Sequence, residues 1–157
     1  MKPASINEIK KELDKLDADK LLELTLRLAR YKKDNKELLT YLLFEADDEA
    51  AYVENVKGEI DQQFSELPKG SLYIFKKSLR KILRMANKQI RYSGSKQSEL
   101  ELRIHFCTLL KNSGIRLDKS PVLLNLYQQQ LKKIQSTLTK LSEDLQFDYQ
   151  RAMERLS

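Results

Sequence analysis

The chain has 157 residues, and its 29 Lys and Arg against 23 Asp and Glu give a formal net charge of +6. Leu occurs 28 times, Val and Ile together 12 times, and Gly and Pro together seven times. This composition favours helices over strands, and it excludes collagen-like, disordered and mostly-β classes. The single cysteine, Cys107, excludes an internal disulfide.

The N-terminal residues lack the apolar stretch of a signal peptide, and no apolar run approaches the roughly 20 residues that a membrane helix needs. We therefore expect a cytoplasmic protein that does not enter membranes. Its length predicts one domain over residues 1–157.

The first part of the chain predicts four helices. Ser5 followed by Glu8 is a capping box, and Asp17, Asp34 or Asn35, and Asp47 are the next candidate N-caps. Leu, Val, Ile and Phe recur at helical spacing after each cap. The expected helices span about 5–16, 17–33, 34–43 and 47–67.

The middle of the chain predicts two longer helices after the turn Pro68-Lys69-Gly70. Ser71 caps a helix to about residue 92, which Gly94 ends. The next helix, about 98–112, is apolar around nearly its whole circumference, so it belongs at the centre of the fold.

The last helical region opens at Ser120-Pro121 and carries a heptad seam over residues 124–145. This seam could form a homodimer, but we favour packing within its own domain. Residues 121–156 could form one helix, or two if Ser142 caps a separate one. The expected fold is seven or eight helices in successive antiparallel hairpins, with the Pro68–Gly70 turn as the alternative point of subdivision.

Two stretches carry a resemblance to a known family. The first is Lys11-Glu12-Leu13-Asp14-Lys15-Leu16, together with the Leu-rich helix that follows it. The second combines the helix that contains Lys76-Lys77-Ser78-Leu79 with the later segment Leu109-Leu110-Lys111-Asn112-Ser113-Gly114-Ile115. Over most of residues 10–130 the chain resembles a small family of bacterial all-helical proteins that is a domain of unknown function. The resemblance implies an all-helical fold and no particular catalytic residue.

Charge is distributed unevenly along the sequence. Residues 1–68 carry a net charge of −5, residues 69–116 of +10 and residues 117–157 of +1. Seven cations of the helix 71–92 fall within an arc of about 140° opposite its apolar face, at about 100° per residue. These residues, which we call the basic face, are Lys76, Lys77, Arg80, Lys81, Arg84, Lys88 and Arg91.

The basic face could be a binding site or could be neutralised within the protein. As a binding site it could take an anion such as the phosphates of RNA or DNA, with Tyr73 on the same arc for base stacking, or an acidic protein or lipid surface. Alternatively, the segment 45–66, with eight acidic residues against Lys57 alone, could fold back and neutralise it. Of these interpretations, we favour neutralisation.

No residue pattern indicates catalysis or a cofactor. His105 is the only histidine, and its helical neighbour Glu101 at i−4 could give two metal ligands, fewer than a zinc site needs. We instead expect a hydrogen-bonded surface pair between them, and Cys107 in the core. The sequence predicts a non-enzymatic adaptor or scaffold that binds another macromolecule, most simply a protein, through helix faces; nucleic-acid binding through the basic face is the alternative.

Overall fold

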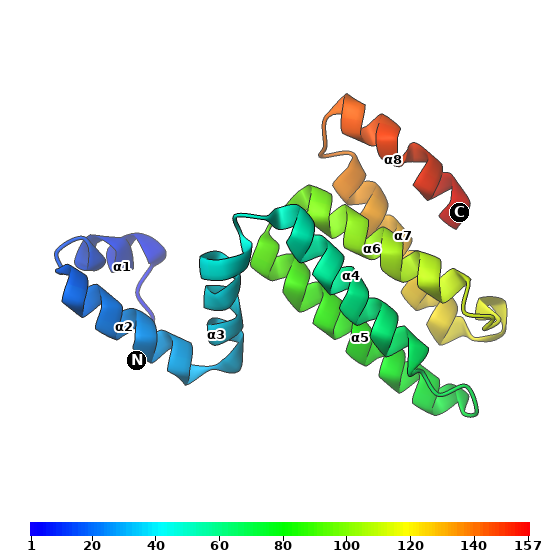
Figure 1. Cartoon of the computed structure of the whole chain (residues 1–157), viewed down its shortest axis with the longest axis horizontal. Coiled ribbons are helices and arrows are strands. Elements are labelled where there is room, and N and C mark those ends of the chain that lie inside the picture. Colours follow the sequence, from blue (N-terminus) through cyan, green and yellow to red (C-terminus); the bar gives the residue numbers. More distant parts are fainter. The chain divides into compact units, whose positions relative to one another are not determined.

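The computed structural model describes all 157 residues, and it contains eight α-helices and no strand (Figure 1). This confirms the predicted all-α class. A π-helical turn, η1 (Tyr41–Glu45), and a short 3₁₀ turn, η2 (Leu117–Lys119), complete the elements. The helices are α1 (Ile6–Leu13), α2 (Ala18–Tyr31), α3 (Lys33–Thr40), α4 (Glu49–Ser65), α5 (Leu72–Ser93), α6 (Lys96–Lys111), α7 (Pro121–Leu138) and α8 (Glu143–Leu156).

The chain divides into two compact units, Met1–Phe44 and Glu45–Ser157, which we call the N-terminal and C-terminal units. The sequence predicted one domain, with subdivision at the Pro68–Gly70 turn as the alternative. That turn lies inside the C-terminal unit, where it joins α4 to α5.

Local capping chemistry accounts for most helix boundaries. The Ser5 and Glu8 capping box forms at the start of α1, and Asp17 accepts a hydrogen bond from the Lys20 amide at the start of α2. Asp48 caps α4, one residue after the predicted Asp47. Gly94 ends α5 with φ of 68°, a left-handed conformation that costs glycine little.

In the N-terminal unit, α3 begins differently from the prediction. Neither Asp34 nor Asn35 caps it; the N-cap is Lys32, whose side chain makes no capping hydrogen bond. The Asn35 side chain instead donates to the Leu28 carbonyl oxygen at 2.8 Å, and α2 and α3 pack together. The side-chain amide of Asn35 therefore supplies a hydrogen bond to a carbonyl oxygen near the end of α2 that has no partner within the helix.

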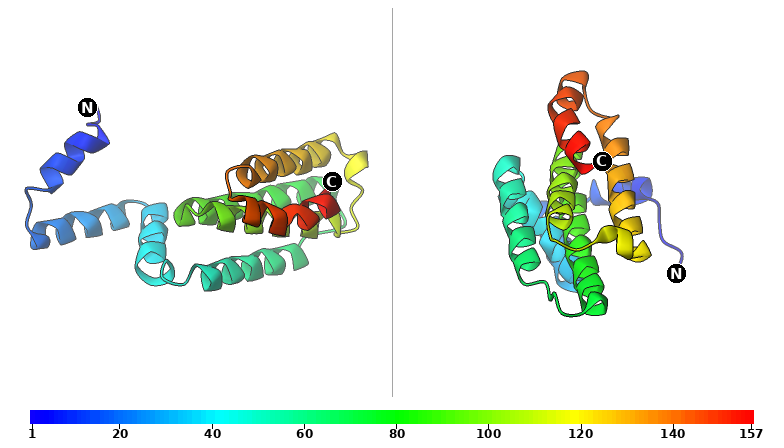
Figure 2. Two further views of the ribbon diagram at one scale, coloured as in Figure 1. Left: turned by 90° about the horizontal axis from the view of Figure 1, so that it is seen from above. Right: turned by 90° about the vertical axis from the view of Figure 1, so that its right-hand side faces the viewer.

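The C-terminal unit is a bundle in which α4 to α7 run antiparallel to their chain neighbours (Figures 1 and 2). As predicted, α6 is central: it contacts α4, α5, α7 and α8. Its apolar residues Leu100, Leu102, Cys107 and Leu110 have no exposed surface. The rings of Phe64 in α4 and Phe106 in α6 form an edge-to-face pair, with centroids 5.5 Å apart.

The last helical region forms two helices, not one. α7 ends at Leu138, and α8 starts after Ser142, which occupies the N-cap position without a side-chain hydrogen bond. The heptad-seam residues Tyr127, Ile134 and Leu138 are buried, because α7 packs on α6 and α8. These three residues are thus covered within the C-terminal unit, whereas Leu124, Leu131, Leu141 and Leu145 of the seam are half-buried.

Candidate interaction surfaces

The basic face lies on the exposed side of α5, because the apolar residues Phe75, Leu79, Ile82, Ala86 and Ile90 bury the opposite side. All seven cations are exposed except Lys76, which is half-buried. Lys88 is engaged in an interaction of its own. The six others form no ion pair and no side-chain hydrogen bond; they are Lys76, Lys77, Arg80, Lys81, Arg84 and Arg91.

The expected neutralisation by the segment 45–66 does not occur for these six cations. The carboxylates of α4 point elsewhere: Asp61 pairs with His105 of α6 at 2.6 Å, and Glu54 pairs with Lys57 of its own helix at 3.1 Å. Glu49 accepts hydrogen bonds from Ser93 and, at 2.5 Å, from Ser98. Sequence proximity across a tight turn predicts pairing with the basic face. In the structure, Asp61 and Glu49 contact His105 and Ser98 of α6, and Glu49 also contacts Ser93, the last residue of α5.

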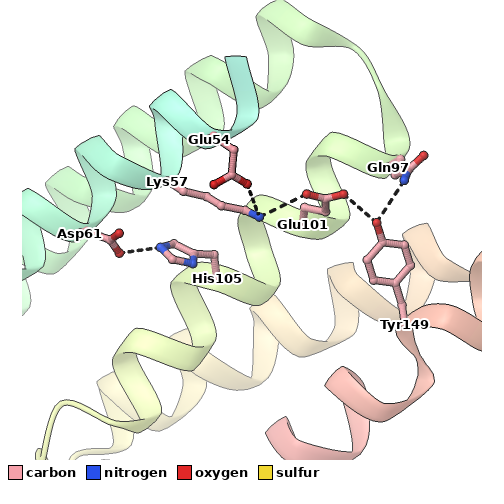
Figure 3. A network of polar contacts seen from close by, with 7 residues as sticks. All are labelled: Glu54, Lys57, Asp61, Gln97, Glu101, His105 and Tyr149. Atoms are coloured by element: carbon pink, nitrogen blue, oxygen red, sulfur yellow. Dashed lines mark hydrogen bonds and ion pairs between the residues drawn. The ribbon is translucent and has the colours of Figure 1, made fainter. Parts of the chain in front are cut away.

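A polar network crosses α4, α6 and α8 (Figure 3). Lys57 donates to Glu101 at 3.2 Å, and Tyr149 donates to the other oxygen of Glu101 at 2.8 Å. Burial lowers the pKa of Lys57, but hydrogen bonds to Glu54 and Glu101 outweigh it and hold this pKa above its usual range. The network therefore ties three helices together with a charged lysine at its middle.

The predicted pair between His105 and Glu101 is wrong. Although the two residues are one helical turn apart, His105 binds Asp61 and Glu101 binds Lys57 and Tyr149. No group of three or more His, Cys, Asp or Glu side chains is placed to hold a metal ion. Packing against neighbouring helices decided these pairings, which a single-helix wheel does not show.

Cys107 lies in the core, as predicted, with no exposed surface. Burial raises its pKa to about 12, although the positive charge of Arg103 acts in the opposite direction. A thiol with such a pKa is overwhelmingly protonated at neutral pH, so it is a poor nucleophile and metal ligand.

Arg103 is a buried charge that the sequence did not indicate. It is 7% exposed and donates to Glu99, to Asn87 of α5 and to Gln130 of α7, each at 2.9 Å. Its three acceptors come from three helices, so the guanidinium group joins α5, α6 and α7. Its role is structural, since all these contacts lie within the C-terminal unit.

The N-terminal unit presents a second candidate surface, which sequence reasoning missed. Its helices α1, α2 and α3 are amphipathic, yet none of their residues is buried. A hollow of about 230 Å³ lies between α2 and α3. We call this hollow the apolar groove; it is lined by Thr25, Leu28, Ala29, Asn35, Leu38, Leu39 and Leu42.

The leucine side chains of the N-terminal unit are largely exposed to solvent, unlike those of a hydrophobic core. Leu22 is 59% exposed, Leu28 62% and Leu43 61%. The sequence shows the same leucine spacing that a buried helix would have, so periodicity alone predicts an apolar face without showing what covers it. Large exposed apolar patches mark interaction sites in soluble proteins.

Comparison with known proteins returns no similar family, protein or fold: no family model, no curated protein and no solved structure matches the chain. The resemblance to the bacterial all-helical family therefore stays a prediction. None of the helices combines the length and apolarity needed to cross a membrane.

Proposed function

We propose that this protein is a non-enzymatic adaptor whose N-terminal unit holds an acidic amphipathic helix of a partner protein in the apolar groove. The observation that carries this proposal is the absence of any buried residue in α1, α2 and α3, despite their strong amphipathicity. Binding an amphipathic helix in an apolar groove is a recurrent mode of peptide recognition.

Energetics favour an external partner for this unit. A chain of about 40 residues rarely buries enough apolar surface to be stable without metals, disulfides or association. Covering an exposed leucine fully is worth about 1.5–3 kcal/mol. Leu28, Leu38 and Leu42 line the groove and are 38–62% exposed, so a partner side chain seated there would recover several kcal/mol.

Charge around the groove indicates the kind of partner. Residues 27–36 include five cations and one acidic residue, Asp34. Arg27, Arg30 and Lys36 are adjacent in sequence to groove-lining residues, are exposed and form no ion pair. A helix with acidic flanks complements this rim, whereas a second copy of the chain would bring the same positive charge to it.

Fluorescence anisotropy with two labelled amphipathic peptides tests the proposal. The peptides share the same apolar positions, and one has Glu and the other Lys on its flanks. We expect the acidic peptide to bind the full chain, and the double variant L28E/L42E to weaken binding at least tenfold. The variant V122E, which adds a charge at an exposed apolar position of α7, is the matched control and should bind normally.

Two results would contradict the proposal. Equal binding by the acidic and basic peptides would remove the charge argument. Failure of both peptides to bind, with sedimentation showing a dimer that L28E/L42E dissociates, would assign the groove to a second copy of the chain.

A further inference from the structure

The basic face, in the C-terminal unit, is a second candidate surface, and six of its seven cations, all but Lys88, form no ion pair. Helix α5 has 22 residues and contains no acidic residue. Exposed helices ordinarily mix charges, because opposite charges at i and i+4 stabilise a helix and like charges repel by similar amounts. Six unpaired cations on one helix face therefore carry a cost that folding does not explain, and an external anion would relieve it.

The geometry of the face is linear. From Lys76 to Arg91 the helix rises about 22 Å, or about four turns. Arg80, Arg84 and Arg91 lie within about 40° of one another around the helix axis, at 100° per residue. They form a straight row of guanidinium groups, and each such group can bind a phosphate with two parallel hydrogen bonds.

One aromatic side chain continues this row. Tyr73 falls on the same line, about two turns before Arg80, and it is 76% exposed. A large exposed ring beside unpaired arginines is the combination that binds single-stranded nucleic acid, in which cations follow the phosphates and an aromatic ring stacks on a base.

We propose that the basic face of α5 binds single-stranded RNA or DNA without sequence preference, through phosphate contacts along Arg80, Arg84 and Arg91 and base stacking on Tyr73. Anionic membranes are a weaker fit, because interfacial helices insert a wide apolar face, whereas the apolar residues opposite these cations, such as Leu79 and Ile82, are buried in the bundle.

Anisotropy with labelled 20-nucleotide single strands of RNA and DNA at about 50 mM salt tests the proposal with the full chain. Three phosphate contacts predict that log K falls with log salt with a slope near −2, at about −0.7 per contact. The double variant R80E/R84E should lose at least tenfold in affinity. The matched control, K132E/K133E, makes the same charge change at two exposed cations of α7 and should bind within about twofold of wild type.

Stacking is tested separately with Y73A, which should lower affinity for single strands at least fivefold and leave the salt slope unchanged. All substituted residues are exposed, so circular dichroism should show unaltered folding. The proposal is overturned if no single strand binds at 50 mM salt, or if K132E/K133E weakens binding as much as R80E/R84E. It is also overturned if duplex DNA or phosphatidylserine vesicles compete better than single strands.

Discussion

Replacement of Arg103 by alanine should destabilise the C-terminal unit more than any exposed charge substitution. The change removes a guanidinium group that is 7% exposed and its hydrogen bonds to Glu99, Asn87 and Gln130. The Gln130 side chain, itself 3% exposed, would lose this partner inside the bundle.

The magnitude follows from those lost contacts. Breaking a buried charged network by removing one partner costs about 3–5 kcal/mol, and each buried acceptor left unpaired contributes about 1–3 kcal/mol of it. Glu99 keeps partial contact with water, because 27% of its side chain is exposed, so we expect the lower part of this range, about 3–4 kcal/mol. For a unit of this size the melting temperature should fall by roughly 10–20 °C.

Urea unfolding followed by circular dichroism measures this effect. The control R116A removes an exposed arginine that pairs only with Asp118, and it should cost no more than about 0.5 kcal/mol. The double variant R103M/Q130L removes the charge and its most buried acceptor together, so it should be more stable than R103A. An R103A protein within about 1 kcal/mol of wild type would refute the reasoning that this network holds α5, α6 and α7 together.

Three further outcomes follow from the structure. Burial first, and then the nearby Cys107, raises the pKa of Tyr127 to about 12, and Cys107 itself has a pKa of about 12. Both groups release their protons at lower pH in the unfolded chain than in the folded one. The free energy of unfolding should therefore be unaffected below about pH 8.5 and fall as pH rises towards 12. The urea midpoint of C107A/Y127F should decline less over that range. Y149F removes the hydroxyl that donates to Glu101, so it should lower the free energy of unfolding by about 1 kcal/mol and speed hydrogen exchange in α8. Unchanged exchange in α8 would show that this contact does not hold the helix. F106A should cost about 3–5 kcal/mol in urea unfolding, since the ring is 1% exposed, and a loss under 1 kcal/mol would contradict the packing described.

Sequence predicted what depends on local chemistry. Ser5, Asp17, Ser71 and Ser120 cap helices as expected, because a capping side chain and the amides that it accepts from lie within four residues. The central position of α6 could also be predicted from the sequence, because a helix that is apolar around nearly its whole circumference has no wide polar face to expose to solvent.

Sequence could not predict contacts between helices. The choice of Asp61 by His105, and of Lys57 by Glu101, depends on how α4 lies on α6. For the same reason, sequence proximity wrongly predicts that the acidic segment 45–66 neutralises the basic face, whereas the structure leaves six of its seven cations unpaired. Periodicity likewise could not distinguish leucines that are buried in a core from leucines that stay exposed, such as Leu28.

We propose that the N-terminal unit is incomplete without a partner helix, and hydrogen exchange of the full chain tests this most directly. In the free protein at low concentration, the amides of α2 and α3 should exchange orders of magnitude faster than those of α5 and α6, because no residue of α2 or α3 is buried. Adding the acidic amphipathic peptide should protect α2 and α3 and leave α5 and α6 unchanged. Protection of α2 and α3 in the free monomer equal to that of α6 would contradict the claim.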